Sequence, residues 1–238
     1  MSVTLDQHFF LALIEIIWIN ILLSGDNAVA IALACRPLPP KQRRWGIMLG
    51  SLGAITLRII FSVFVVYLLE VPYLKVTGSI LLLWIAIKLI LPEEQGEEGE
   101  SKAAGTLFAA VRTVIIADAV MSLDNVIAIA AAAEGSMILL IVGLAISMPL
   151  IVYGSTLVLK ALERFPLLIT AGGALLGWIA GEVLITDPVL ASTVEHDAPY
   201  LHDLYIAPFV GALFVVIVGL WLARTIEARR RQKLDVTP

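Results

Sequence analysis

Two short polar motifs interrupt long apolar runs, and their side chains are of the types that bind hard cations. The first motif, residues 24–27, reads Ser-Gly-Asp-Asn, and the second, residues 122–125, reads Ser-Leu-Asp-Asn. Each motif supplies a carboxylate, an amide oxygen and a hydroxyl oxygen. An ionised carboxylate at the centre of a bilayer costs at least roughly 2.5–3.5 kcal/mol. Because two such groups occur in matching apolar contexts, we predict a binding site within the membrane.

The composition of the paired motifs predicts which ligand they bind. Facing one another, they would present roughly six oxygens with a charge near −2, a set that suits Mg²⁺, Ca²⁺ or Mn²⁺. No histidine lies inside an apolar run, and the single cysteine, Cys35, stands at the end of one. Copper(I) and tetrahedral zinc sites are therefore disfavoured.

A third carboxylate, Asp118, lies six residues before Asp124. This separation is about 240° around a regular helix, so the two carboxylates share a face only if the helix breaks between them. Otherwise Asp118 faces another helix, where it could accept a proton. Gly25 favours a break in the first motif because glycine tolerates unusual dihedrals, whereas Leu123 gives the second motif no such help. The full set of candidate metal ligands is Ser24, Asp26, Asn27, Asp118, Ser122, Asp124 and Asn125.

The polar residues of the apolar runs also admit a structural interpretation. Buried Asp, Asn and Ser can hold helices together by hydrogen bonds alone, and this alternative applies to the motifs as well. Arg58 is predicted to be a structural counter-charge. Glu15 and Glu182 either line an exit path or only pack against neighbouring helices, and both roles stay open.

The composition places these motifs in a membrane protein. The chain has 238 residues, of which 60% are hydrophobic, against about 45–50% in soluble domains. We predict an all-α membrane protein with seven transmembrane helices, because the apolar runs reach helix-spanning length. No enzyme, nucleic-acid-binding domain or tightly bound cofactor is expected, since little of the chain lies outside the spans. The predicted spans are residues 9–35, 46–69, 72–91, 107–133, 137–159, 166–186 and 206–223.

Basic residues in the connecting segments predict the orientation. Lys and Arg concentrate after the first span, after the fifth span and in the C-terminal tail. With seven spans, all three segments fall on one side, which the positive-inside rule makes cytoplasmic. We therefore predict a multi-pass protein of the inner (cytoplasmic) membrane with its N-terminus outside and its C-terminus in the cytoplasm. The first span lacks a basic flank and a small-residue cleavage site, so it is expected to be a retained helix.

The second motif belongs to an internal repeat. Six of the nine positions in residues 24–32 are identical in residues 122–130, and residues 78–88 resemble residues 172–182. Three spans per repeat give the halves opposite orientations, so we predict a 3+3 inverted-topology repeat plus one C-terminal helix. The predicted units are residues 1–91 (first repeat), 92–105 (acidic cytoplasmic linker), 106–186 (second repeat), 187–205 (outer loop) and 206–238 (seventh helix and basic tail).

The stretches at residues 24–34 and 118–126, together with the seven-span plan, resemble the TerC family of integral membrane proteins. The resemblance covers roughly residues 8–225. It implies export of divalent manganese, with an older association with tellurium resistance. It also implies metal-binding roles for Asp26, Asn27, Asp124 and Asn125, and for Asp118 as well. Some relatives carry a carboxylate where this chain has Asn20, which leaves the first half-site here with one charge fewer.

We therefore expect a membrane exporter of manganese or a similar hard divalent cation. Proton coupling is plausible because carboxylates must lose their protons to bind a metal. Two other classes stay open. One is an exporter of another small solute, such as an amino acid or an oxyanion. The two aspartates argue against an anion-binding site, and Arg58 alone argues for one. A non-transporting partner for assembly or metal loading of other proteins would dock a membrane protein through its basic segments and acidic linker. The oligomeric state and the choice of metal are not fixed.

Overall fold

Every regular element of the described residues is an α-helix. The computed structural model describes residues 7–22, 24–69, 71–92, 100–133, 136–197, 200 and 204–235. These ranges contain no strand, which confirms the all-α prediction for them. The helices are α1 (Gln7–Leu22), α2 (Gly25–Cys35), α3 (Pro40–Leu69), α4 (Leu74–Ile90), α5 (Glu100–Ala132), α6 (Met137–Arg164), α7 (Leu167–Ile185), α8 (Pro188–Asp197) and α10 (Ile206–Asp235).

Five helices in the described part of the chain, α3, α5, α6, α7 and α10, are long and apolar enough to cross a membrane. The pair α1 and α2 is a sixth candidate, with a bend of 49° between its two halves. Helix α4 has 17 residues and is about 26 Å long, somewhat short of a hydrocarbon core of about 30 Å. The predicted total of seven spans therefore stays a prediction.

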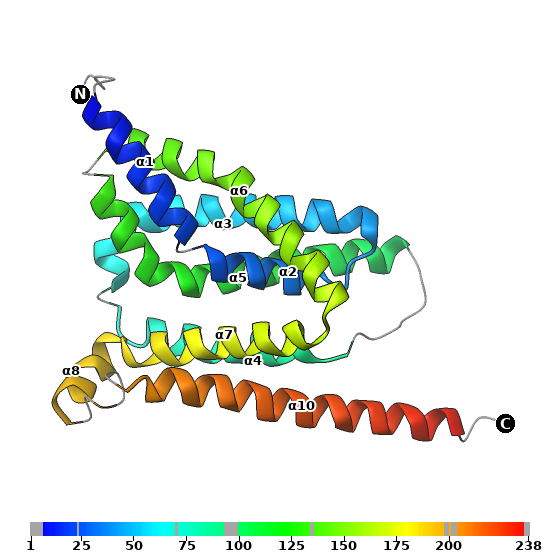
Figure 1. Cartoon of the computed structure of the whole chain (residues 1–238). Coiled ribbons are helices and arrows are strands. Elements are labelled where there is room, and N and C mark those ends of the chain that lie inside the picture. The colour runs from blue at the N-terminus through cyan, green and yellow to red at the C-terminus, as the bar shows by residue number, and fades with distance from the viewer. Residues whose placement is uncertain are drawn as a thin grey trace.

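The long helices lie side by side, and α1 crosses them at an angle (Figure 1). Helix α3 packs along α5, α4 along α7, and α10 against both α7 and α4. Glycines permit the close approach of α3 to α5: a Cβ added at Gly53 would lie 2.6 Å from the Ile115 side chain, and one at Gly50 would lie 3.0 Å from Val114. The two glycines therefore determine which faces of α3 and α5 meet, and a larger residue at Gly50 or Gly53 would change this packing.

The first motif lies where the chain breaks between α1 and α2. Ser24 has a φ of −111° and a ψ of 4°, outside the helical range, and α2 begins at Gly25. Helix α5, in contrast, continues through the second motif as far as Ala132. The sequence expectation that Gly25 favours a break, and that Leu123 does not, agrees with this difference.

A buried carboxylate joins two helix ends outside the membrane spans. Asp187 is fully buried and accepts hydrogen bonds from the backbone N–H groups of Tyr73, Lys75 and Val76 at the start of α4. It also accepts from Val189 N, 3.0 Å away, at the start of α8. Helix α8 lies within the segment predicted as an outer loop. Asp187 thus satisfies N–H groups that helix starts leave without intrahelical partners.

Replacing Asp187 with Asn is expected to lower the free energy of unfolding by about 1–3 kcal/mol, because several buried donors lose a charged acceptor. Burial raises the pKa of the Asp187 carboxyl, but the four backbone donors outweigh it and leave the pKa below its ordinary value of 3.8. The stabilisation is therefore present above the ordinary pKa and is lost as the pH falls through the lowered one. Thermal unfolding in detergent between pH 7 and pH 3 measures this. The exposed Asp197 supplies a matched Asp→Asn control, and equal melting temperatures for both variants would contradict the assignment.

Candidate functional site

A buried arginine lies at the centre of the polar residues inside the helix bundle. Arg58 on α3 is 2% exposed. Its Nη2 donates to Asp118 Oδ1 on α5 at 2.8 Å, which forms an ion pair. Its Nε donates to Ser122 Oγ at 3.1 Å, and its Nη1 donates to Asn20 Oδ1 on α1. The prediction that Arg58 is a counter-charge is confirmed, and its partner is Asp118. A buried charge of this kind is stable only when it is paired and hydrogen-bonded.

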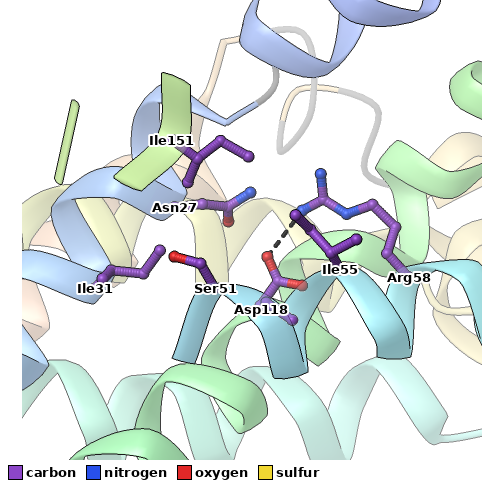
Figure 2. A pocket seen from close by; sticks show the side chains of 8 residues that line it. Asn27, Ile31, Ser51, Ile55, Arg58, Asp118 and Ile151 are labelled. Atoms are coloured by element: carbon purple, nitrogen blue, oxygen red, sulfur yellow. Dashed lines mark hydrogen bonds and ion pairs between the residues drawn. The ribbon is translucent and has the colours of Figure 1, made fainter. Parts of the chain in front are cut away.

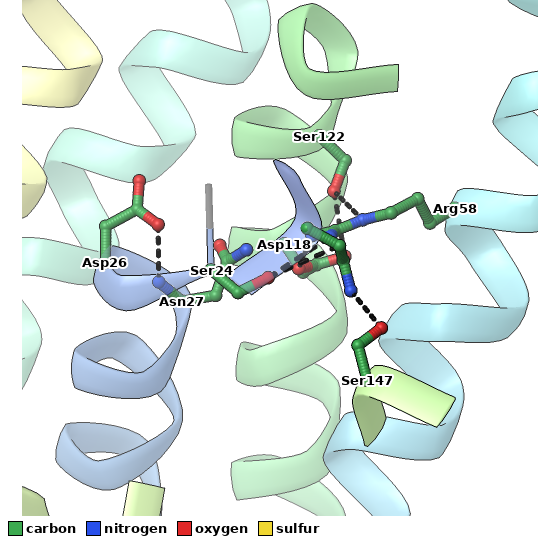
Figure 3. A network of polar contacts seen from close by, with 8 residues as sticks. Ser24, Asp26, Asn27, Arg58, Asp118, Ser122 and Ser147 are labelled. Atoms are coloured by element: carbon green, nitrogen blue, oxygen red, sulfur yellow. Dashed lines mark hydrogen bonds and ion pairs between the residues drawn. The ribbon is translucent and has the colours of Figure 1, made fainter. Parts of the chain in front are cut away.

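The groups around Arg58 form two matched pairs, in each of which a motif serine donates to the polar residue four positions before it (Figure 3). On α5, Ser122 Oγ donates to Asp118 Oδ2 at 3.0 Å. On the broken span, Ser24 Oγ donates to Asn20 Oδ1 at 3.4 Å. Residues four apart on a helix share a face, which explains the contact of Ser122 with Asp118 on α5, whereas Ser24 reaches Asn20 across the break between α1 and α2. The guanidinium therefore lies between corresponding positions of the two motif stretches.

A fourth helix joins the network through Ser147 on α6. Asn20 Nδ2 donates to Ser147 Oγ at 2.5 Å. Ser147 Oγ in turn donates to the backbone Gly143 O of its own helix at 2.9 Å. The contacts thus link α1, α3, α5 and α6 through side chains that are nearly inaccessible. In such surroundings each of these hydrogen bonds is stronger than it would be in water.

A small cavity of about 10 Å³ adjoins the ion pair (Figure 2). Asn27, Ser51, Arg58 and Asp118 supply its polar lining, and the remaining lining is apolar. The volume is close to the roughly 10–15 Å³ that one water molecule needs. Ser51 on α3 is 1% exposed, and within the described ranges its hydroxyl has no hydrogen-bond partner. The cavity therefore offers an unused hydroxyl beside a carboxylate in a space the size of one small ligand.

Asp26 lies apart from this network. Its side chain is half-buried, and its Oδ1 accepts a hydrogen bond from Asn27 N at 2.7 Å. Figure 3 shows Asp26 apart from Arg58 and Asp118, with Asn27 and Ser24 drawn between them. No ion pair to Asp26 occurs among the residues that the structure describes. Asp26 is therefore a carboxylate at the start of α2 whose charge no neighbouring cation pairs with directly.

The structure brings some of the predicted ligands together and leaves others separate. Ser24, Asn27, Asp118 and Ser122 are buried and lie around Arg58 or its cavity. The side chain of Asp124 falls outside the described part of the chain. Asn125 is half-buried on α5. Within the described ranges, no group of three Asp, Glu, His or Cys side chains could hold a metal, so a shell that pairs Asp26 with Asp124 stays a prediction.

The candidate ligands predicted from the sequence omit three residues of the site: Asn20, Ser51 and Ser147. Asn20 carries a usable signal, because it precedes Ser24 by the same four residues that separate Asp118 from Ser122. Ser51 and Ser147 carry no such signal in the sequence, since a serine in a membrane helix commonly forms a hydrogen bond only with a backbone carbonyl of its own helix. Their role depends on which face of α3 and α6 meets the motifs.

A family model described as "Integral membrane protein TerC family" matches residues 5–231. The chain belongs to the TerC family. The family is associated with transport, and its members are of the transporter kind rather than enzymes. The chain is accordingly a multi-pass integral membrane protein that sits in a lipid bilayer.

Relatives of this TerC-family protein are membrane proteins by name. The uncharacterized membrane protein YjbE of Bacillus subtilis is 42% identical over 203 residues, which cover 83% of this chain and 92% of YjbE. YceF of the same organism is 28% identical over 88% of this chain and 81% of its own length. The inner membrane protein YgdQ of Escherichia coli is 27% identical over 51% of this chain and 58% of its own length. No solved structure matches the chain.

Proposed function

We propose that this TerC-family protein exports a hard divalent cation across the inner membrane, with Mn²⁺ as the first candidate. The observation that carries the proposal is the buried oxygen cluster around Arg58. Asp118 supplies a carboxylate, Ser122 a hydroxyl and Asn20 an amide oxygen. These are the hard oxygen ligands that Mg²⁺, Ca²⁺ and Mn²⁺ prefer.

In this proposal Arg58 acts as a tethered cation that neutralises the site while no metal is bound. Its guanidinium takes the place at Asp118 Oδ1 that a metal ion would take. A metal ion that binds Asp118 must displace the guanidinium. When the metal ion leaves, the ion pair between Arg58 and Asp118 forms again. The cycle avoids an unpaired buried carboxylate in the empty state, which would be strongly destabilising.

The two motifs supply the remaining ligands of the proposed site. Asp26 and Asn27 lie at the start of α2. The neighbouring end of α1 has carbonyl groups without intrahelical partners, and such helix ends coordinate cations in many transporters. Asp124 and Asn125 contribute from α5. Because α2 contacts both α5 and α6, a change in the angle between α1 and α2 would alter access to the site. Carboxylates must be deprotonated to bind metal, so counter-flow of protons is part of the proposal.

The packing of the helices supports an inverted repeat. An exchange of the two halves replaces α3 by α6, α4 by α7, and the pair α1 and α2 by α5. The contact of α3 with α5 then corresponds to the contact of α6 with α1 and α2, and both contacts occur. The described chain also begins and ends at opposite ends of the bundle (Figure 1). Both features fit seven spans with an outer N-terminus and a cytoplasmic C-terminus.

A structural role is the second candidate, because the Arg58 network is satisfied by protein groups alone and links four helices. A protein of this kind would support assembly or metal loading of partners without transport. An oxyanion substrate is less well supported, since the guanidinium already donates to a carboxylate, a hydroxyl and an amide.

Metal uptake into inverted membrane vesicles tests the proposal. Vesicles that contain the protein are expected to accumulate Mn²⁺ in the presence of an outwardly directed proton gradient, and vesicles without the protein are the control. Competition by Mg²⁺, Ca²⁺ and Zn²⁺ ranks the substrates, with zinc expected to compete least. If no divalent cation moves, and the purified protein instead retains a stable partner, the structural candidate replaces the exporter.

A further inference from the structure

A second, larger cavity lies at the end of the bundle where α2 and α4 end and α5 begins. Its volume is about 400 Å³, within the range of roughly 300–1,000 Å³ that is usual for small-molecule sites. Residues from the ends of α2 and α4, from residues 106–113 of α5 and from α10 line it. It is separate from the Arg58 site, whose cavity is lined by other residues.

The lining of this cavity combines an apolar floor with two cations. Leu89, Ala109 and Ile226 supply accessible apolar surface, and Arg36 and Lys88 supply positive charge. No acidic side chain is among the described residues that line it. A cavity with this charge disfavours a divalent cation on its way to the Arg58 site, and it suits an anionic ligand with an apolar part.

The position of Lys88 and Trp84 indicates that the cavity meets the membrane–water interface. Trp84 is 58% exposed, and Lys88 Nζ lies 5.3 Å from the centroid of its ring. Tryptophan is enriched at this level of the bilayer, and lysines near helix ends extend their ammonium groups toward the headgroups. The Lys88 ammonium group is thus placed to meet a phospholipid headgroup, and the apolar lining of the cavity is placed to meet an acyl chain.

We propose that this cavity binds one anionic phospholipid from the surrounding bilayer. Lys88 binds the phosphate group, Arg36 adds positive charge beside it, and an acyl chain lies along the accessible apolar surface of Leu89 and Ala109. Basic pockets between membrane helices are known to select anionic headgroups for this electrostatic reason. Lys41 and Arg44, which are exposed at the start of α3, add to the positive potential at this end of the bundle.

Lipid titration of the purified, delipidated protein tests the proposal, with bound lipid counted by native mass spectrometry. Phosphatidylglycerol is expected to bind more tightly than phosphatidylcholine with the same acyl chains. Lys88→Gln is expected to weaken phosphatidylglycerol binding about fivefold, which corresponds to the roughly 1 kcal/mol that one basic residue contributes near an anionic surface. Lys160→Gln is the matched control and is expected to bind as the wild type does. Lys160 is exposed near the end of α6 and does not line the cavity. It lies at the same end of the bundle as the cavity, because the neighbouring Glu163 forms an ion pair with Arg43 at the start of α3.

Three results would overturn the proposal. Equal binding of the two lipids would show that charge does not select the ligand. An equal loss in Lys88→Gln and Lys160→Gln would show that the effect is general surface charge. Displacement of the lipid by millimolar glycerol phosphate would assign the cavity to a free soluble phosphate, because a lipid held also by its acyl chain should resist that competitor.

Discussion

Asp118→Asn should lower the free energy of unfolding by about 3–5 kcal/mol, the usual loss when one partner of a buried ion pair is removed. The reason is the environment of Arg58, which is 2% exposed and finds its only carboxylate, within the described ranges, in Asp118. The amide keeps the shape of the side chain but leaves the guanidinium charge unbalanced. Thermal denaturation in detergent at pH 7 measures the loss. The exposed Asp197 provides the control Asp→Asn variant, with an expected change within about 0.5 kcal/mol.

A double-mutant cycle with Arg58→Met keeps this prediction decisive even if a single variant folds poorly. Each single variant leaves one buried charge without its partner. The double variant Arg58→Met/Asp118→Asn removes both charges, and replacement of a buried pair by neutral groups is often close to neutral. We therefore expect the double variant to be more stable than either single variant. Losses that simply add would mean that the two groups do not interact, and the network would then have to be described without the ion pair.

The pairing of Arg58 with an aspartate was predictable, but the choice of aspartate was not. A lone arginine within a membrane span must find a counter-charge nearby, whatever the fold. Which carboxylate it meets depends on the rotation of α3 against α5. That rotation is fixed by Gly50 and Gly53 against Val114 and Ile115, a contact between segments distant in the sequence. The composition and the spacing of residues along the chain do not predict this rotation.

The helices were largely predictable because apolar runs of spanning length have few other structures available in a bilayer. The break at Ser24 followed from Gly25, a purely local signal. The burial of Asp187 was not predictable from its polar surroundings in the sequence, since its four donors come from the ends of α4 and α8. Local signals thus gave the elements, while contacts between elements decided the environment of each charged group.

Asp26→Asn should abolish transport without loss of stability, which is the opposite balance to Asp118→Asn. Within the described ranges Asp26 forms no ion pair, and the hydrogen bond that it accepts from Asn27 N can be kept by an amide oxygen. In the proposed site its carboxylate is needed only when a cation arrives. Removal of an outer-sphere partner of a bound metal commonly lowers affinity 10–100-fold, so loss of a direct charged ligand should lower it at least about 100-fold.

Vesicle uptake of Mn²⁺ and the melting temperature, measured on the same preparations, separate the two roles. Uptake by Asp26→Asn should fall to the level of vesicles without the protein, while its melting temperature matches that of Asp197→Asn. If uptake persists, Asp26 is not a metal ligand, and the site reduces to the groups around Arg58. If uptake and stability fall together, the carboxylate at the start of α2 is a structural group, and the broken span is explained by packing alone. Only the separation of the two measurements assigns Asp26 to the cation alone, because Asp26, unlike Asp118, has no ion pair within the described ranges through which it could stabilise the empty protein.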